Sequence, residues 1–385
     1  MSGRPLFPTQ EIGSLAKPRW QLLGQRGEPI DDRAKAEFAS WNERVPFAPD
    51  DPAVAQFLNG RSREVGPATI RDWGALFGLR YLEGAGLDRV YDGEARRIEM
   101  YEYPIRQMHG FDFLGHVRSF DNKYYLKAAV TGEIRLDRPY HVEEFDFVRA
   151  NAKAEPKLPI TGPYTLADWS YNEFYLGRRS GWKSRRVRRD AQREFVVEIA
   201  RRAIRPTLQA LIARGCRVIQ IDEPAAGTHP DEADLVAEGF NAATDGLDAE
   251  FSMHICFSDY RSLFPALLEA KRCTQWAWEF ANRDTETRDG YQILEMFREY
   301  GDTREIGLGV LDVHRDDVET PAKVADRILR AAKILGDPRR IWVNPDCGLR
   351  TRSLSVAYQK LTNMVEGARL ARSAWSDAQP AAPGA

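Results

Sequence analysis

Four residues that can bind a soft divalent metal lie at the ends of short apolar runs in the sequence. His254 and Cys256 end one run, and alternate residues of an extended strand point to the same side. Glu279 ends the next run, and Cys347 follows a later one after a short turn. Two thiolates, one imidazole and one carboxylate form a donor set that suits tetrahedral zinc. The sequence therefore predicts a zinc centre at a place where several strand ends meet.

Each of these residues also has an ordinary structural interpretation when it is considered alone. A lone buried cysteine usually acts as a small apolar side chain, which is our interpretation of Cys216 and Cys273. A lone histidine in a strand is more often hydrogen-bonded than metal-bound. The His-x-Cys spacing of His254 and Cys256 is far less specific than a paired Cys-x-x-Cys pattern. The matching positions of all four residues, rather than any one spacing, favour the metal.

Acidic residues and a second histidine follow other apolar runs in the same way. Asp222 and Glu223 come directly before Pro224, where two acids can bind an ammonium group or orient a base. An aspartate that caps the next helix is the ordinary alternative. Asp312 and His314 follow a further run, and a histidine–aspartate pair there can transfer a proton.

Two short segments, at Gly13-Ser14 and at Glu94, also have groups that can bind a ligand. The Gly13-Ser14 step offers backbone N–H groups that suit a carboxylate. Glu94 follows Asp92-Gly93 and is either an ordinary acid at a helix start or an anchor for an amine. The Gly13-Ser14 segment thus predicts carboxylate binding. For Glu94, a helix-start acid and an amine anchor both stay open.

The elements that position these residues alternate between short apolar strands and amphipathic helices. The clearest helix, residues 190–213, has apolar residues at helical spacing but contains Pro206, where we expect a kink or a break. A second helix, residues 320–335, begins with Thr320 as N-cap and Pro321 in its first turn. The alternation and the chain length predict an α/β protein with a single (β/α)8 TIM barrel, whose strand ends meet at one face. The predicted strands are 157–160, 218–221, 251–256, 275–279, 305–310 and 341–343.

Two stretches depart from this alternation. Residues 117–134 are expected to form a β-hairpin around Asp121-Asn122, an excursion near the rim of the active site. Residues 178–189 contain seven Lys or Arg. The ordinary interpretation of that run is a solvated helix start, and the alternative is a surface for an acidic partner or for the phosphates of a cofactor.

The composition of the 385-residue chain narrows its class. A hydrophobic content of 43% is enough for a large core, and a net charge of -2 gives no general attraction to nucleic acid or to an anionic membrane. The apolar runs are far shorter than the roughly 20 residues that span a bilayer. The chain start has no secretory signal, and four cysteines make no disulfide framework, so we expect a cytoplasmic protein. We assign residues 1–375 to one domain and expect residues 376–385 to be a disordered tail.

Several segments of the chain resemble the catalytic barrel of the cobalamin-independent methionine synthase family. The most specific is Trp342-Val343-Asn344-Pro345-Asp346-Cys347-Gly348-Leu349. The other matching segments are Gln10-Glu11-Ile12-Gly13-Ser14, Asp92-Gly93-Glu94-Ala95-Arg96, Thr161-Gly162-Pro163-Tyr164-Thr165, Asp168-Trp169-Ser170, Ile219-Gln220-Ile221-Asp222-Glu223-Pro224-Ala225, His254-Ile255-Cys256 and Gly309-Val310-Leu311-Asp312-Val313-His314.

The resemblance implies a (β/α)8 barrel that transfers a methyl group to the thiol of homocysteine. It implies that His254, Cys256, Glu279 and Cys347 bind Zn²⁺, and that His314 is the candidate proton-handling residue. A free thiol with a pKa near 8.5 is mostly protonated at neutral pH, and binding to Zn²⁺ leaves a nucleophilic thiolate. We expect Glu279 to be the ligand that yields when the homocysteine sulfur arrives. The implied substrate contacts are Ile12, Gly13 and Ser14 for the carboxylate, Glu94 and Asp222 for the ammonium group, and Trp169 near the pterin of a folate.

Two departures from the family pattern bear on the methyl donor. Long family members carry a second, N-terminal barrel that helps to hold the tail of methyltetrahydrofolate, and this chain has no room for it. The family's Arg-Cys step close to the pterin is replaced here by Lys123-Tyr124. We therefore predict a methyl-corrinoid donor, methylcobalamin either free or bound to a corrinoid protein, with methyltetrahydrofolate as the alternative.

Three other functions are considered for the same pattern. A zinc-dependent transfer of coenzyme M to an epoxide uses the same scaffold, but its thiol has no amine to occupy Glu94 and Asp222. A non-catalytic zinc-binding or thiol-carrier subunit of a larger methyl-transfer complex is a candidate of another class. A metal-free barrel similar to uroporphyrinogen decarboxylase fits less well, because it leaves the cysteines unexplained.

Overall fold

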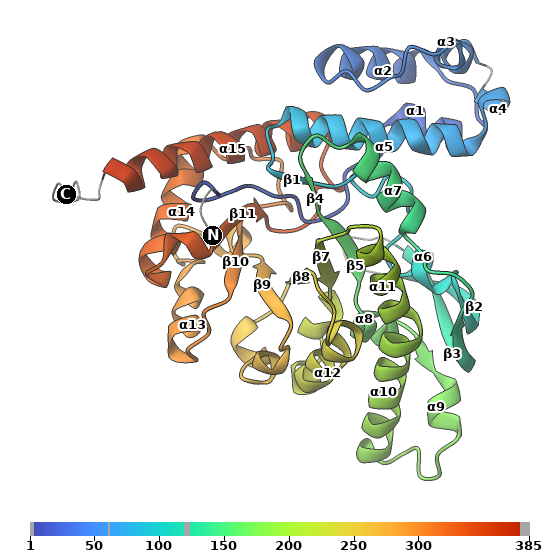
Figure 1. Cartoon of the computed structure of the whole chain (residues 1–385), viewed down its shortest axis with the longest axis vertical. Helices are drawn as coiled ribbons and strands as arrows, with labels where there is room; N and C mark the ends of the chain where they lie inside the picture. The colour runs from blue at the N-terminus through green and yellow to red at the C-terminus, as the bar shows by residue number, and fades with distance from the viewer. Residues whose placement is uncertain (1–3, 61, 119–123, 378–385) are drawn as a thin grey trace.

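The computed structural model describes residues 4–60, 62–118 and 124–377 and shows an α/β protein built on parallel strands (Figure 1). Six strands form one parallel sheet in the order β11-β10-β9-β8-β7-β5. Their bounds are β5 (Leu158–Thr161), β7 (Val218–Asp222), β8 (Glu250–Ile255), β9 (Cys273–Trp278), β10 (Glu305–Leu311) and β11 (Ile341–Pro345). The predicted α/β class with a parallel sheet is confirmed, and all six predicted strands are present with small shifts at their ends.

Short parallel pairs extend this sheet at both of its edges. Strand β1 (Arg89–Val90) pairs with β4 (Glu155–Pro156), which leads directly into β5. The segment at the start of the chain pairs on one side with β11, through Thr9 and Val343, and on the other side with β1, through Gln10 and Arg89. The parallel pairs therefore run in a continuous circuit, which brings the first residues of the chain beside the last strand.

The strands of the sheet are covered on both faces, which suits their largely apolar sequences. Every residue of β7, β11 and β5 is buried, and the helices lie around the outside of the strands (Figure 1). The helices are α1 (Arg19–Gln25), α2 (Asp32–Arg44), α3 (Pro52–Leu58), α4 (Ser62–Val65), α5 (Pro67–Gly84), α6 (Glu102–Ile105), α7 (Val142–Asn151), α8 (Pro163–Asp168), α9 (Glu173–Gly177), α10 (Arg185–Ile199), α11 (Arg205–Ala213), α12 (Ala233–Thr244), α13 (Glu295–Glu299), α14 (Pro321–Leu335) and α15 (Leu354–Asp377).

Local sequence signals explain where the helices begin and end. The Thr320 hydroxyl accepts a hydrogen bond from the backbone N–H of Lys323, and Gly336 ends α14 with φ +77°, so the predicted cap is confirmed. Pro206 does not break its helix. Instead, a π-helical segment, Ala200–Ile204, joins α10 to α11 directly before the proline, whose missing N–H then falls in the first turn of α11.

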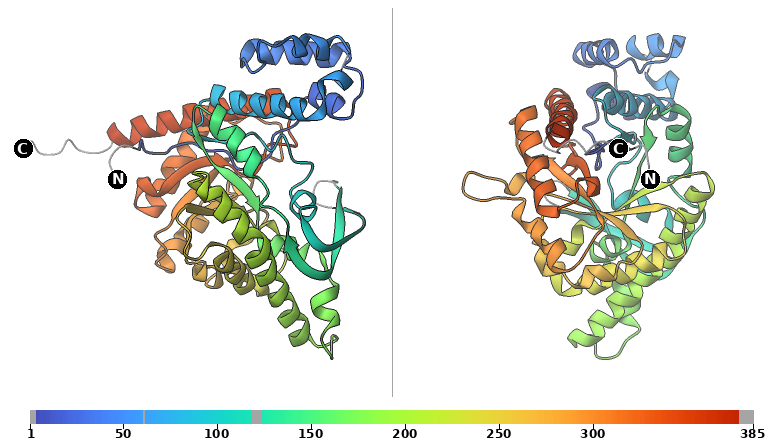
Figure 2. Two further views of the ribbon diagram at one scale, coloured as in Figure 1. Left: turned by 45° about the vertical axis from the view of Figure 1, so that its right-hand side comes forward. Right: turned by 60° about the vertical axis from the view of Figure 1, so that its left-hand side comes forward.

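The predicted hairpin is present but is longer than expected. Strand β2 (Met108–Arg118) pairs antiparallel with β3 (Tyr124–Leu136), and β3 also pairs in parallel with the short β6 (Tyr171–Asn172). The expected turn at Asp121-Asn122 lies outside the described residues. Figure 2 shows the hairpin standing beside α9, away from the main sheet.

The N-terminal helices form a separate layer rather than a second barrel. Helices α2, α3 and α4 lie beyond α5, on its far side from the sheet (Figures 1 and 2). Aromatic contacts hold this layer, including Trp20 stacked on Phe47 with centroids 5.5 Å apart. At the other end of the chain, α15 continues through Asp377, and the rest of the expected tail lies outside the described residues. Within the described residues, no helix has the length and apolar character needed to cross a membrane.

Candidate functional site

A cavity of about 190 Å³ collects most of the residues that the sequence predicted for the site. The residues come from the ends of several strands of the sheet and from the loops that follow them, where the ends of parallel strands meet. The predicted residues that line the cavity are Ile12, Gly13, Ser14, Glu94, Trp169, Asp222, His254, Cys256, His314 and Cys347. Glu279 and Asp312 are absent from the lining.

Three of the predicted metal ligands form a compact group. One donor atom each from His254, Cys256 and Cys347 lies within 4.8 Å of the others. The Nδ1–H of His254 donates to the carbonyl of Ala277 at 2.8 Å, which leaves Nε2 as the nitrogen that could bind a metal. This buried Nε2 has no hydrogen-bond partner among the described residues. Two thiols and an unpartnered imidazole nitrogen at this spacing fit a zinc ion.

The electrostatics of this group favour a thiolate. Hydrogen bonding from the Cys256 thiol lowers the pKa of Cys347 well below its usual range, against the effect of burial, and the positive charge of His254 lowers it further. The same hydrogen bond, together with burial, raises the pKa of Cys256. Burial lowers the pKa of His254, but the negative charge of Cys347 outweighs it and raises that pKa to about 9. Cys347 is therefore the more acidic of the two thiols.

Glu279 lies close to the group without belonging to it. It follows β9 directly and is fully buried, and its backbone N–H donates to the hydroxyl of Tyr260 at 2.8 Å. Its Oε2 accepts from the backbone N–H of Phe257 and from Asn282. Its Oε1 has no hydrogen-bond partner among the described residues and lies 3.7 Å from Nε2 of His314. The carboxylate of Glu279 is thus held between His314 and the group formed by His254, Cys256 and Cys347.

Asp312 and His314 were expected to form a proton-transferring pair, but their side chains do not contact each other in that way. Oδ1 of Asp312 accepts from the backbone N–H of His314 at 2.8 Å, which shapes the turn after β10. The imidazole of His314 lies instead beside Glu279 and against the ring of Phe257, with centroids 4.6 Å apart. These contacts favour a turn-forming role for Asp312.

Of the two acids that end β7, only Asp222 lines the cavity. Its Oδ1 accepts from Nε2 of Gln220 at 2.7 Å, and burial raises its pKa to about 7. Glu223 points the other way and accepts from the backbone N–H groups of Tyr164 and Thr165, which open α8. Its role is structural, and burial raises its pKa to about 8. Glu94, the second predicted ammonium ligand, lines the same cavity as Asp222.

Close backbone packing fixes the segment predicted to hold a carboxylate. The carbonyl of Ile12 accepts from Nε2 of Gln220 at 2.6 Å. A Cβ on Gly348 would lie 2.8 Å from the backbone nitrogen of Ser14, so only glycine allows this approach. The loop that carries Cys347 therefore packs directly on the Gly13-Ser14 step.

Aromatic and charged residues that sequence reasoning missed complete the lining. Tyr125 stacks on the predicted Trp169, with centroids 5.2 Å apart. Glu99 and Arg350 also line the cavity. Tyr125 lies in the predicted hairpin, and Arg350 lies in the segment just after Cys347, so both were close to recognised signals. Glu99 lies three residues after the matching segment 92–96, which gave no reason to single it out.

Comparison with known proteins decides the family. The model of the cobalamin-independent synthase catalytic domain matches residues 74–370. A methionine synthase of Pyrococcus abyssi (strain GE5 / Orsay) is 36% identical over 369 residues, which cover 96% of this chain and 94% of that protein. The chain belongs to the cobalamin-independent methionine synthase family. It is therefore an enzyme, a methyltransferase of the methionine synthase type.

Other members of the family agree with this assignment. A methionine synthase of Thermoplasma acidophilum is 41% identical over 307 residues, which cover 74% of this chain and 85% of that protein. A solved B12-independent methionine synthase from Shewanella sp. W3-18-1, in complex with selenomethionine, superposes with a TM-score of 0.72 at 24% identity. The superposition covers 97% of this chain and 99% of that one, so the two chains share the same fold.

Proposed function

We propose that this enzyme methylates the thiol of homocysteine at a zinc ion bound by His254, Cys256, Glu279 and Cys347. The observation that carries the proposal is the compact group of one imidazole and two thiols, in the same cavity as Glu94 and Asp222. Bound Zn²⁺ supplies a Lewis acid that keeps a coordinated thiol deprotonated and nucleophilic at neutral pH. Glu279 is assigned as the fourth ligand because it is fully buried beside the group and has one carboxylate oxygen without a hydrogen-bond partner.

The remaining residues of the cavity suit an amino acid that carries a thiol. Asp222 and Glu94 supply carboxylates for the ammonium group, and the backbone N–H groups of the Gly13-Ser14 step suit the substrate carboxylate. Fixing both charged ends of homocysteine directs its thiol toward Cys256 and Cys347. This positioning lowers the entropy cost of reaching the in-line geometry that methyl transfer requires.

We assign proton handling to His314 and a mobile carboxylate to Glu279. A thiol that binds as thiolate releases one proton, and the two side chains are 3.7 Å apart. A protonated His314 would be close enough to hold the carboxylate of Glu279 if that carboxylate no longer bound the metal. The proposed roles thus account for the position of Glu279 between His314 and the group formed by His254, Cys256 and Cys347.

We further propose that the methyl donor is a methyl-corrinoid, either free methylcobalamin or a corrinoid protein. The cavity of about 190 Å³ is smaller than the roughly 300–1,000 Å³ of sites that enclose drug-sized ligands, so it suits homocysteine alone. Exposed aromatic side chains at its mouth, Tyr124 and Phe257, suit contact with a large donor that stays outside. Methyltetrahydrofolate is the second candidate, favoured by the stacked pair of Trp169 and Tyr125.

The circuit of parallel pairs leads us to infer a (β/α)8 barrel as the scaffold of this site. The segments that carry the proposed roles then come from the ends of its strands, as in other enzymes of that architecture. Transfer of coenzyme M to an epoxide on the same scaffold is less well supported, because that thiol has no amine for Asp222 and Glu94 to bind.

Parallel assays of the zinc-loaded enzyme test the function and the donor together. Homocysteine is supplied with methylcobalamin or with methyltetrahydrofolate, and methionine is measured. We expect methionine from both mixtures or from methylcobalamin alone, with the higher kcat/KM for methylcobalamin. Equal or higher kcat/KM with methyltetrahydrofolate refutes the donor assignment, and no methionine from either donor refutes the proposed function.

A further inference from the structure

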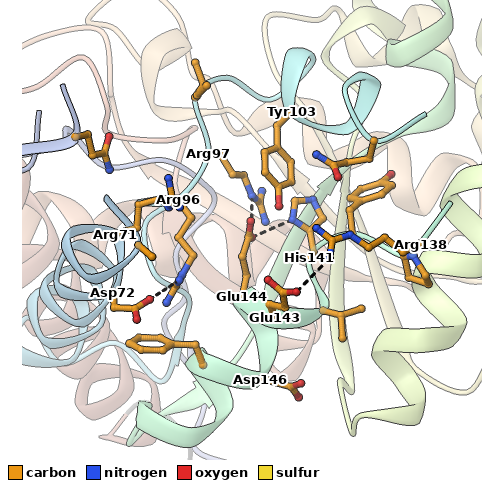
Figure 3. A pocket seen from close by; sticks show the side chains of 18 of the residues that line it. Arg71, Asp72, Arg96, Arg97, Tyr103, Arg138, His141, Glu143, Glu144 and Asp146 are labelled. Atoms are coloured by element: carbon orange, nitrogen blue, oxygen red, sulfur yellow. Dashed lines mark hydrogen bonds and ion pairs between the residues drawn. The ribbon is translucent and has the colours of Figure 1, made fainter. Parts of the chain in front are cut away.

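A second and larger cavity lies beside the catalytic one, with a volume of about 1520 Å³. It is formed by the segment after Ser14, helices α5, α7 and α11, and the loop that follows β1. Figure 3 shows Arg71, Asp72 and Arg96 on one side of it and Arg138, His141 and Glu143 on the other, with Arg97 and Glu144 between them. Its size suits an organic molecule much larger than an amino acid.

The cavity is positively charged although the whole chain is not. Its lining contains seven cationic and four anionic side chains, an excess of three positive charges, whereas the chain carries a net charge of -2. The cationic residues are Lys17, Arg71, Arg96, Arg97, Arg138, Arg214 and Arg350. No ion pair is recorded for Arg71 or Arg350 within the described part of the chain. A concave surface of this sign attracts anions.

Buried polar atoms without partners point to a ligand that the protein itself does not supply. Nη2 of Arg97 and the hydroxyl of Tyr140 have no hydrogen-bond partner among the described residues, and each residue is only 4% exposed. Nε and Nη2 of Arg96 are also without a hydrogen-bond partner, while its Nη1 lies 2.6 Å from Asp72. Unsatisfied buried donors cost free energy, so such a cluster needs an explanation.

The acids in the wall are already engaged with neighbouring residues. Glu144 contacts Arg97 at 3.4 Å and Nδ1 of His141 at 3.0 Å, and Tyr103 stacks on that imidazole. Glu143 contacts Arg138 at 3.5 Å. Arg96, Arg97 and Tyr140 line the cavity and keep buried polar atoms without a hydrogen-bond partner among the described residues, although Nε of Arg96 also lies 3.9 Å from Oδ2 of Asp92.

Arg97 and Arg350 connect this cavity with the catalytic one. Nη1 of Arg97 lies 3.6 Å from Oε1 of Glu94, which lines the catalytic cavity. Arg350 lines both cavities. A ligand in the large cavity would therefore lie next to the substrate site without entering it.

We propose that the large cavity is a second binding site for an organic polyanion whose carboxylate or phosphate groups contact Arg96, Arg97 and Tyr140. Guanidinium groups bind both kinds of anion through paired hydrogen bonds, so the shared chemistry is a planar or tetrahedral oxyanion. The proposal does not rest on the proposed function, because Arg96, Arg97 and Tyr140 are not among the residues assigned to methyl transfer.

Calorimetric titration of the full-length protein at physiological ionic strength tests this site with two probes, tricarballylate for carboxylates and inorganic phosphate for phosphates. We expect saturable binding of at least one probe at one site per chain. The Arg96→Gln variant is expected to bind that probe about tenfold more weakly, as the loss of one charge-assisted hydrogen bond predicts. The probe that binds identifies the kind of anion.

A double variant and a matched control keep the result interpretable. Arg71→Gln/Arg138→Gln removes two cations from the rim without touching the buried network, and it is expected to weaken binding as well. Arg193→Gln, on α10 and outside the cavity lining, removes an arginine paired with Glu238 and is expected to bind like the wild type. Absence of binding by both probes, or equal binding by all four proteins, overturns the proposal.

Discussion

Cys347 is the residue on which the proposed metal centre depends most directly. Its thiol has the lowered pKa of the pair and lies within 4.8 Å of the donors of His254 and Cys256. We expect Cys347→Ser to lose most of its zinc, because a serine hydroxyl is a poor replacement for a thiolate ligand. Elemental analysis of the purified variant measures the loss.

The other two cysteines of the chain provide matched controls for that substitution. The thiol of Cys216 contacts the backbone carbonyl of Val218, and that of Cys273 contacts the carbonyl of Gln275. Burial raises the pKa of each thiol to about 12. We expect Cys216→Ser and Cys273→Ser to keep about one zinc per chain, provided that they fold. Wild-type zinc content in Cys347→Ser would falsify the ligand assignment.

Asp222 tests the proposed recognition of the substrate amine. Truncating one partner of a buried charge pair costs about 2–5 kcal/mol, so Asp222→Asn is expected to raise the KM for homocysteine by roughly 30-fold or more. Zinc content should not change, because Asp222 is not a ligand. Comparison of homocysteine with 3-mercaptopropionate, which lacks the amine, provides the second readout. Equal efficiency with both thiols in the wild-type enzyme contradicts the role.

At the scale of the elements, the packing of α5 against the turn after β1 holds Glu94 in position. A Cβ on Gly78 of α5 would lie 2.2 Å from the carbonyl oxygen of Asp92. We expect Gly78→Ala to lower the free energy of unfolding by about 1–3 kcal/mol and to raise the KM for homocysteine, because the turn that carries Glu94 must move. Urea denaturation and steady-state kinetics measure the two effects.

A glycine in open space serves as the control for Gly78. No atom lies within 4 Å of a Cβ built on Gly177, at the end of α9, and its backbone needs no positive φ. Gly177→Ala should therefore leave both the free energy of unfolding and the KM close to wild type. Similar losses in both variants would show that the close contact between α5 and the Asp92 turn is not what supports Glu94.

The strand ends were predictable from sequence, and the longer-range pairings were not. Buried parallel strands are continuous apolar runs, so the residues that end them, such as His254 and Asp222, could be identified by position alone. The side-chain direction of Glu223 could not, because it depends on two backbone N–H groups of α8. The early start of β2 was missed because Met108 to Gly115 contains two glycines and no β-branched residue.

The fine geometry of the site shows the same limit. The position of Glu279 at the end of an apolar run grouped it with the other three ligands. In the structure, His254, Cys256 and Cys347 have donor atoms within 4.8 Å of one another, whereas a carboxylate oxygen of Glu279 lies 3.7 Å from His314. Asp312 and His314 were adjacent enough to suggest a pair, and only the structure shows that the aspartate contacts the histidine's backbone N–H. Which side-chain atoms meet is decided by rotamers and loop conformation, which the spacing of residues does not encode.

At the scale of the whole molecule, one chain contains every group that the proposed reaction needs. The predicted ligands, the two acids and the aromatic pair all lie in or beside one cavity formed by this chain alone. We therefore expect the purified protein, without any other protein, to form methionine from homocysteine and free methylcobalamin. A requirement for a second protein, with free methylcobalamin present in excess, would instead support the role of a carrier subunit.

X-ray absorption at the zinc edge tests the central claim most directly, because it counts the sulfur atoms bound to the metal. The account predicts two sulfur ligands, from Cys256 and Cys347, in the zinc-loaded enzyme alone. After addition of homocysteine it predicts three, with one oxygen or nitrogen ligand lost as Glu279 leaves. A sulfur count that stays at two with saturating homocysteine would contradict activation of the substrate thiol by the metal.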